Sequence, residues 1–189
     1  MTKIDGIVLC GGCSTRAKAN KMISLIEGEP MIVHTVKSIL PFVNNLYVVT
    51  GHYHDDTVNS LNSFSNITIV HNESYMKGMF SSVLKGVKRV KNDFFILPGD
   101  CPFVKPSTFE LLLSSTGDIR CPSYKNKDGH PLYISYSLVN ELLSMSSESN
   151  LKEFRNKHGF TKVEVNDPNI LNDIDTHEDY INLLKKERK

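Results

Sequence analysis

Residues Ile4 to Arg16 read IDGIVLCGGCSTR, an apolar run that ends in two adjacent glycines. The continuous apolar stretch at its centre is typical of a strand buried on both faces of a parallel sheet. Gly11 and Gly12 have no Cβ atom, so the backbone after this strand can approach an anion closely. Ligands of α/β sheets gather at the carboxyl ends of the strands, where this turn falls. The stretch predicts a strand followed by a phosphate-binding turn.

The same alternation of short β-rich runs and helical patterns continues along the chain and predicts an α/β fold with a mostly parallel sheet. Beyond about residue 115 the pattern is less regular and predicts an antiparallel element. Strands are expected over Ile4–Leu9, Leu46–Thr50, Ile67–Val70, Phe94–Leu97, Asp118–Pro122, Leu132–Ile134 and Lys162–Val165, and helices over Met31–Leu40, Asp55–Phe64, Met79–Val90, Pro106–Leu113, Ser137–Met145, Leu151–His158 and His177–Lys186.

Length and charge limit the classes of protein to consider. A chain of 189 residues fits one domain, here residues 1–189, with 40% hydrophobic and 23% charged residues. The net charge of +1 provides no overall field for nucleic acid or membrane binding. The apolar run near the N-terminus is too short for a signal peptide, and no apolar stretch has the length of a membrane span. We therefore expect a cytoplasmic protein that binds neither nucleic acid nor membrane.

The cysteines do not form a recognisable metal or disulfide pattern. Cys10 and Cys13 have the spacing of half a zinc site, but Cys101 and Cys121 each precede a proline and do not complete it. A cytosolic location argues against structural disulfides. Free thiols are the favoured interpretation, and a redox or zinc role is the alternative.

Two cations follow the glycine turn. The loop matches neither the Gly-x-x-x-x-Gly-Lys-Ser/Thr nor the Gly-x-Gly-x-x-Gly pattern, so Arg16 and Lys21 would have to supply its positive charge. A guanidinium offers a forked contact to phosphate oxygens and an ammonium a point charge, and both suit a reaction that builds charge on phosphorus. The alternative is a surface turn with two solvated cations.

Carboxylates in two distant segments suit a magnesium site. Asp100 ends a predicted strand, and Asp173 and Asp175 straddle an apolar residue, so both can face one way from an extended segment. Magnesium prefers a few carboxylates together with substrate phosphates and water. A purely structural role in turns or caps is the alternative.

Two further segments carry polar groups that suit a substrate. Gly78, Ser81 and Ser82 open a predicted helix and can hold a base or a ribose, although helix capping explains the serines as well. His130, in a turn that leads into a strand, can bind substrate or have no role.

Taken together, these residues resemble the MobA-like NTP transferase family, which includes the molybdenum cofactor cytidylyltransferases and guanylyltransferases. The resemblance spans nearly the whole chain, and the late family stretch Asp-Ile-Asp-Thr-x-Glu-Asp is matched from Asp173 to Asp179. Departures occur where Cys10 replaces Ala and where Ala17 and Lys18 replace Met-Gly. The opening pattern, Leu-Ala-Gly/Ala-Gly-x-Ser-x-Arg-Met-Gly-x-x-Lys, is met by Leu9, Gly11, Gly12, Ser14, Arg16 and Lys21.

This resemblance implies a three-layer α/β/α, Rossmann-like fold of the nucleotide-diphospho-sugar transferase type. It also implies a Mg²⁺-dependent nucleotidyltransferase, with Mg²⁺ on Asp100 and Asp175 and catalytic roles for Arg16, Lys21 and Asp100. His130 would contact the acceptor. The nucleotide would be bound by Leu9, Cys10, Gly11, Gly12, Ser14, Arg16, Lys21, Asn72, Gly78, Ser81 and Ser82.

The substrates that the resemblance implies are a nucleoside triphosphate and a small phosphorylated acceptor. The segments Gly78–Ser82 and Gly129–Pro131 are closer to the cytidylyltransferase branch, which favours CTP over GTP, and molybdopterin is the implied acceptor. A molybdoenzyme is a possible partner that receives the product. A sugar phosphate or another phosphorylated alcohol is the rival acceptor. A glycosyltransferase and a non-catalytic nucleotide sensor are the rival functions.

Overall fold

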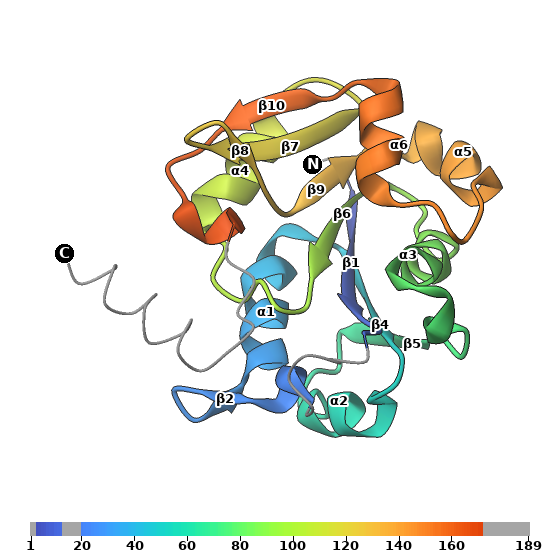
Figure 1. Ribbon diagram of the computed structural model, residues 1–189. Helices are drawn as coiled ribbons and strands as arrows, with labels where there is room; N and C mark the ends of the chain where they lie inside the picture. Colours follow the sequence, from blue (N-terminus) through green and yellow to red (C-terminus); the bar gives the residue numbers. More distant parts are fainter. Residues whose placement is uncertain (1–2, 13–19, 172–189) are drawn as a thin grey trace.

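The computed structural model describes residues 3–12 and 20–171, which form a central sheet covered by helices on both faces (Figure 1). β1 (Ile4–Cys10) lies inside this sheet. It runs parallel to β4 (Asn45–Thr50) on one side and to β6 (Asp93–Pro98) on the other. A strand enclosed in this way is buried along its whole length, as its apolar sequence predicts.

The remaining strands extend the sheet in both directions and make it mixed. β5 (Ile67–His71) pairs parallel to β4 at one edge. On the other side, β9 (Leu132–Ile134) lies antiparallel between β6 and β7 (Ile119–Tyr124). β10 (Thr161–Glu164) runs parallel to β7 at the far edge, and the short β8 (Lys127–Asp128) pairs with β7. The predicted antiparallel element is therefore present, and β9 supplies it.

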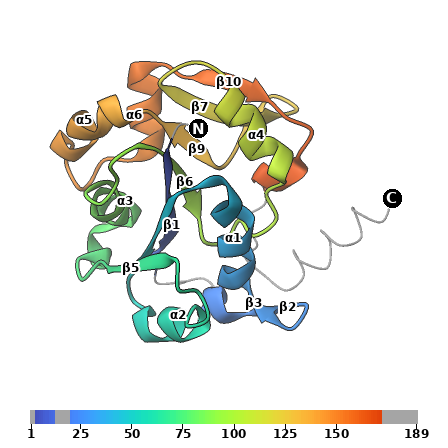
Figure 2. The same cartoon turned by 180° about the vertical axis from the view of Figure 1, so that it is seen from behind.

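Helices cover the two faces of the sheet, as Figures 1 and 2 show from opposite sides. Side chains of α1 and α4 pack with Val8 of β1 in one buried cluster. Side chains of α3, α5 and α6 pack with Ile7 and Leu9 in another. Successive residues of β1 thus face opposite layers, and the predicted three-layer α/β fold is confirmed. The helices are α1 (Met31–Ile39), α2 (His54–Ser60), α3 (Met79–Val87), α4 (Pro106–Ser114), α5 (Val139–Ser144) and α6 (Leu151–His158).

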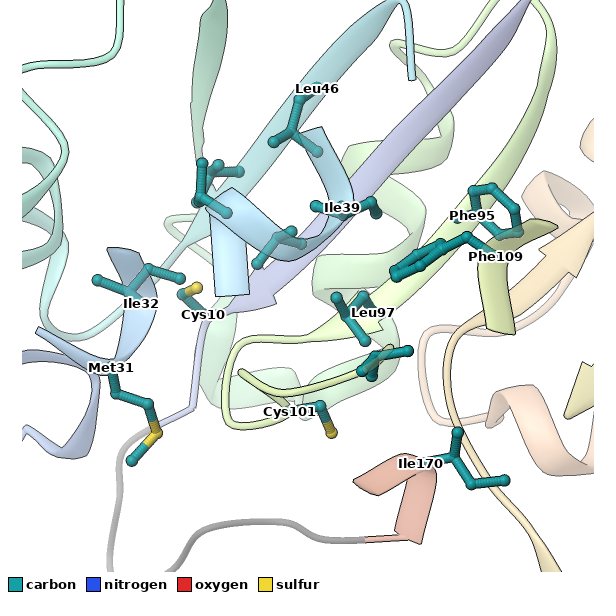
Figure 3. Packing of buried hydrophobic residues seen from close by; sticks show 14 of the residues in the cluster. Cys10, Met31, Ile32, Ile39, Leu46, Phe95, Leu97, Cys101, Phe109 and Ile170 are labelled. Atoms are coloured by element: carbon teal, nitrogen blue, oxygen red, sulfur yellow. The ribbon is translucent and has the colours of Figure 1, made fainter. Parts of the chain in front are cut away.

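Aromatic packing anchors the α1 and α4 layer to the sheet. Phe109 of α4 meets Phe95 of β6 edge to face, with ring centroids 5.4 Å apart, and stacks on Phe42 at 4.7 Å. Figure 3 shows Phe109 beside Phe95 and Leu97. Such pairs add specificity to apolar burial because the rings prefer defined orientations.

The cysteines within the described residues form no disulfide. Cys10, Cys101 and Cys121 are buried, and the interpretation of the cysteines as thiols without a zinc or redox role stays a prediction. Cys13 lies outside the described residues.

Several boundaries differ from the sequence-based prediction. α2 ends at Ser60 and not at Phe64, because the chain turns there: the Phe64 amide donates to the Leu61 carbonyl. α3 ends at Val87, three residues before the predicted Val90. Most other elements lie within two residues of their predicted ends. The predicted helix His177–Lys186 lies outside the described residues.

A small hairpin was not predicted. β2 (Leu25–Ile26) and β3 (Glu29–Pro30) are joined by Glu27 and Gly28, which both have positive φ, 51° and 86°. Two-residue turns of this kind favour Asn-Gly or Asp-Gly, so a Glu-Gly turn between such short strands carries a weak sequence signal. Short 3-10 helices were also missed: η1 (Lys21–Ile23), η2 (Leu40–Phe42), η3 (Tyr75–Lys77), η4 (Tyr136–Leu138) and η5 (Pro168–Leu171).

Candidate active site

The carboxyl ends of β1, β4 and β6 bring three glycines to one edge of the sheet. The Gly99 amide after β6 donates to the Leu9 carbonyl at 2.9 Å. Gly51 follows β4, and a Cβ atom added there would lie only 2.8 Å from the Gly11 Cα. Backbone without side chains therefore lines this edge, which suits the close approach of an anion.

A half-buried ion pair lies at the same edge. The Lys21 ammonium donates to Asp100 Oδ2 at 2.6 Å, and the two side chains are 16% and 19% exposed. Asp100 lies two residues after the end of β6, whereas Lys21 opens η1. Two residues that were predicted to take part in the chemistry, from distant parts of the chain, are thus in contact. Their attraction is stronger here than between fully solvated charges, because less water screens it.

Two buried polar side chains hold this ion pair in position. The Asn20 side chain caps η1 by accepting from the Met22 amide at 3.1 Å, and it donates to Asp56 of α2 at 3.3 Å. The Thr35 hydroxyl of α1 donates to the carbonyl oxygen of Gly99 at 2.7 Å. Sequence reasoning missed Asn20, Asp56 and Thr35. The Asn20–Asp56 and Thr35–Gly99 contacts join distant segments, and the cap at Asn20 belongs to a 3-10 helix of three residues, which leaves a weak local signal.

A second polar cluster adjoins the glycine turn, and Asn72 is its centre. The fully buried Asn72 side chain donates to Ser81 Oγ at 2.9 Å and to Ser82 Oγ at 3.0 Å, and it accepts from the Ser74 amide at 3.1 Å. A Cβ atom on Gly11 would meet the Ser82 hydroxyl. The predicted nucleotide-binding residues Gly11, Asn72, Ser81 and Ser82 therefore lie together, and the two serines are almost completely buried.

Gly78 begins α3 in a conformation that favours glycine. Its φ of 96° lies in the region that side chains avoid, and it is the N-cap of the helix. Its carbonyl accepts from the Ser81 hydroxyl at 2.7 Å. The first turn of α3, with backbone amides that point toward its N-terminal end, opens beside the Asn72 cluster.

The Gly-His-Pro turn lies against the last described segment. The His130 amide donates to the Ile170 carbonyl at 2.9 Å, and a Cβ atom on Gly129 would lie 2.8 Å from the Ile170 Cβ. Asn169 Nδ2 donates to the carbonyl of Phe103 at 3.0 Å, and Phe103 lies three residues after Asp100 in the chain. The structure thus brings η5 close to the loop that follows Asp100. The role of His130 in contacting the acceptor stays a prediction.

Several predicted site residues lie outside the described part of the chain: Ser14 and Arg16 of the phosphate loop, its departures Ala17 and Lys18, and the late aspartates Asp173 and Asp175. η5 ends at Leu171, two residues before Asp173.

The described donors agree with a hard divalent cation. Asp100 offers carboxylate oxygens, and Mg²⁺ commonly takes only one or two protein carboxylates and completes its shell with phosphates and water. Within residues 3–12 and 20–171 no group of three or more His, Cys, Asp or Glu side chains is placed to hold a metal. The neighbouring Cys10 adds no thiolate: burial, and then the Asp100 charge, raises the pKa of its thiol far above the usual range.

A nucleotidyltransferase is the class of protein that this fold and this edge of the sheet define. Residues 6–163 match the family model described as the MobA-like NTP transferase domain. The chain therefore belongs to this family, and the resemblance seen in its motifs is confirmed.

Individual relatives show how far the similarity extends. The chain is 28% identical to the molybdenum cofactor cytidylyltransferase of Escherichia coli K12 over 183 residues, 96% of this chain and 95% of that protein. It is 26% identical to a probable molybdenum cofactor guanylyltransferase of Bacillus cereus B4264 over 121 residues, which are 62% of this chain and 59% of the relative. The longer alignment is thus the one with the cytidylyltransferase.

Solved structures support the fold. A nucleotidyl transferase from Methanothermobacter superimposes with a TM-score of 0.83 over 97% of both chains, at 21% identity. A Mycobacterium tuberculosis H37Rv protein that was solved in complex with manganese gives a TM-score of 0.77, also at 21% identity, over 97% of this chain and 99% of that one.

Proposed function

We propose that this nucleotidyltransferase transfers CMP from CTP to a phosphorylated acceptor, with release of pyrophosphate. The observation that carries the choice of CTP is the alignment with the Escherichia coli cytidylyltransferase, which covers 96% of this chain against 62% for the guanylyltransferase. The Gly78–Ser82 segment, which resembles the cytidylyltransferase branch, supports the same choice.

In this proposal the chain positions two phosphates and stabilises charge. An oxygen of the acceptor phosphate forms a bond to the α-phosphorus of the triphosphate, and the bond from that phosphorus to the bridging oxygen breaks, so pyrophosphate leaves. Lys21 and Arg16 contact the phosphates and stabilise the charge that develops. Asp100 and Asp175 would hold Mg²⁺, which when bound neutralises and orients the phosphate oxygens. No protein nucleophile is required.

The glycine edge and the Asn72 cluster support binding of the nucleotide. The backbone at Leu9, Cys10, Gly11 and Gly12 would approach the triphosphate, with Ser14 in the same loop. The neutral Cys10 thiol adds no negative charge beside these phosphates. Ser81, Ser82 and Asn72 bind one another, so their contribution is to shape the wall around the base and ribose together with Gly78.

The proposal also includes the acceptor, the partner that receives the product and the location of the protein. Molybdopterin is the acceptor, His130 contacts it, and a molybdoenzyme receives the product. Residues 1–189 form one domain in the cytoplasm that binds neither nucleic acid nor membrane. In the part of the chain that the structure describes, no helix is both long and apolar enough to cross a bilayer.

A sugar phosphate is the second candidate acceptor, because its phosphate offers the same attacking oxygen. The two candidates share nucleotide and metal chemistry and differ in the acceptor alone.

The test is pyrophosphate release by the purified protein with Mg²⁺ and each of CTP, GTP, ATP and UTP, with molybdopterin, with sugar 1-phosphates and with no acceptor. Release that needs CTP and molybdopterin supports the proposal, and release with a sugar phosphate supports the second candidate. Asp100→Asn should lower the rate about 100-fold or more. Asp118→Asn, which removes an exposed carboxylate next to β7, is the matched control and should leave it unchanged. Equal rates in the two variants would remove Asp100 from the proposed site.

A further inference from the structure

We propose that the Lys21 ammonium is a built-in counter-ion of Asp100, and that it must leave this carboxylate before a divalent cation can bind there. Nucleotide and metal would then bind as a coupled pair, because the triphosphate supplies the new partner for Lys21. This inference rests on the proposed function, in which Asp100 is a metal ligand and Lys21 contacts phosphate.

The geometry places the ammonium in direct contact with the proposed metal ligand. Lys21 Nζ lies 2.6 Å from Asp100 Oδ2. Mg²⁺ lies about 2.0–2.1 Å from its ligand oxygens, so a metal on this carboxylate and the ammonium would share the same few ångströms. Two positive charges this close repel strongly at a site that water screens only in part. The Asp100 carboxylate can therefore bind the Lys21 ammonium or a divalent cation, but not both at once.

The backbone on both sides of the ion pair is held in place. The Lys21 side chain must therefore move to reduce the repulsion between its ammonium and the metal. Asn20 caps η1, and the next residue, Met22, is buried in the core. On the other side, Gly99 is fixed by hydrogen bonds with Leu9 and Thr35. The four-carbon stem of Lys21 is the flexible link between these supports, and a lysine can swing its charge without moving the chain.

A bound triphosphate removes the competition between Lys21 and the cation for Asp100. Its oxygens lie where the glycine edge admits an anion, and they offer Lys21 a partner of higher charge than one carboxylate. Asp100 is then available to the cation that accompanies the phosphates. Because coupling free energies are reciprocal, the nucleotide raises metal affinity by the same factor as the metal raises nucleotide affinity. Removal of the Lys21 charge should reduce that factor.

The test measures Mn²⁺ binding by the full chain without nucleotide, with free Mn²⁺ followed by electron paramagnetic resonance. Lys21→Met should bind Mn²⁺ at least about tenfold more tightly than the wild type, even though it loses activity. Lys21→Gln is the second variant, because it removes the charge but keeps a polar side chain. Lys21→Arg keeps the charge and should bind as weakly as the wild type. Lys88→Met, at the exposed end of α3, is the control for a general loss of positive charge.

A second measurement repeats the titration with a non-hydrolysable CTP analogue. Wild-type protein should gain more Mn²⁺ affinity from the analogue than Lys21→Met does. Thermal unfolding of each variant checks that the fold is kept.

The outcomes separate the two proposals. If Asp100→Asn binds Mn²⁺ as tightly as the wild type when the CTP analogue is bound, Asp100 is not a ligand, and the proposed metal site fails together with this inference. If Asp100→Asn loses Mn²⁺ affinity with the analogue, while Lys21→Met and Lys21→Gln bind Mn²⁺ no more tightly than the wild type without nucleotide, the metal site stands and the counter-ion role is overturned.

Discussion

The Ser82 hydroxyl lies in the space that a Cβ atom on Gly11 would need. The neighbouring Gly12 differs: among the described residues, apart from its neighbours in the chain, no atom lies within 4 Å of the position of its Cβ. The two glycines of the turn are thus constrained in different ways. Packing against Ser82 requires the first, whereas a ligand that approaches the backbone would require the second.

Gly11→Ala and Gly12→Ala should therefore have different effects. The Gly11 variant should lower the free energy of unfolding by about 1–3 kcal/mol, because its methyl group overpacks the Ser82 side chain. The Gly12 variant should stay within about 0.5 kcal/mol of the wild type. It should still weaken nucleotide binding, because a Cβ would project toward the phosphates. Urea unfolding and calorimetric titration with CTP measure the two effects, and equal stability loss in both variants would contradict the packing argument.

The buried Asn72 should be important for stability as well as for the shape of the site. Asn72→Ala removes hydrogen bonds to two serine hydroxyls and one backbone amide, and leaves these groups buried. We expect a loss of about 2–4 kcal/mol, since an unsatisfied buried polar group costs about 1–3 kcal/mol. Ser60→Ala is the control: its hydroxyl donates only to a backbone carbonyl on an exposed helix surface, and its loss should cost under about 0.5 kcal/mol. Chemical denaturation of both variants measures these free energies of unfolding. If Asn72→Ala loses no more stability than Ser60→Ala, Asn72 is not important for stability.

The strands of the sheet were predicted correctly because each buried strand is marked by its own apolar run in the sequence. The apolar run of β1 predicted its strand to within one residue, and Leu132–Ile134 and Leu151–His158 match their predicted bounds. The pairing of Lys21 with Asp100 follows from topology: 79 positions separate them, but β1 and β6 are neighbours, so the segments that follow both strands meet at one edge.

The supports of the site could not be predicted in this way. Thr35 reads as one more polar residue of an amphipathic helix, and only the packed structure shows that its hydroxyl reaches Gly99, 64 positions away. Asn20 and Asp56 are likewise ordinary polar residues until η1 and α2 are brought together. Side-chain contacts between distant segments depend on the packing of whole elements, which leaves no periodic trace in the sequence.

Thr35 should act as a positioning residue for Asp100. Thr35→Val keeps the shape of the side chain but leaves the Gly99 carbonyl without its donor, next to Asp100. We expect the unfolding free energy to fall by about 1–3 kcal/mol. We also expect kcat to fall about tenfold with a smaller change in KM for CTP, because small displacements of a catalytic group affect chemistry more than binding.

Ser38→Ala is the matched control for Thr35→Val. Ser38 also lies on α1 and donates to a backbone carbonyl, that of Thr35, but it has no described contact with the site. Steady-state kinetics should show wild-type kcat for this variant. A loss of stability in Thr35→Val without any change in kcat would leave Thr35 a purely structural residue.

Burial should make Cys121 unreactive in the folded protein. Burial raises the pKa of the Cys121 thiol from 9.0 to about 11, although the Arg155 guanidinium, 2.9 Å from the sulfur, acts in the opposite direction. A shift of two pKa units lowers the thiolate fraction at pH 8 about 100-fold, and the thiolate is the reactive form. Because the folded state prefers the protonated thiol, this group adds nothing below pH 9 to the pH dependence of stability. It lowers stability as the pH rises from about 9 to 11, where the unfolded chain has fewer bound protons.

Iodoacetamide labelling at pH 8, with peptides resolved by mass spectrometry, measures this reactivity. Cys121 should be alkylated at least about 100-fold more slowly in the native protein than in 6 M urea, since low access adds to the low thiolate fraction. Arg155→Met should slow the native reaction further, because the nearest positive charge that favours the thiolate is lost. Arg155 also pairs with Asp128 at 3.1 Å. Asp128→Asn breaks that pair but keeps the guanidinium, and it removes a carboxylate that raises the thiol pKa, so it should speed the reaction. Faster labelling of Arg155→Met would mean that access, and not the thiol pKa, limits the reaction.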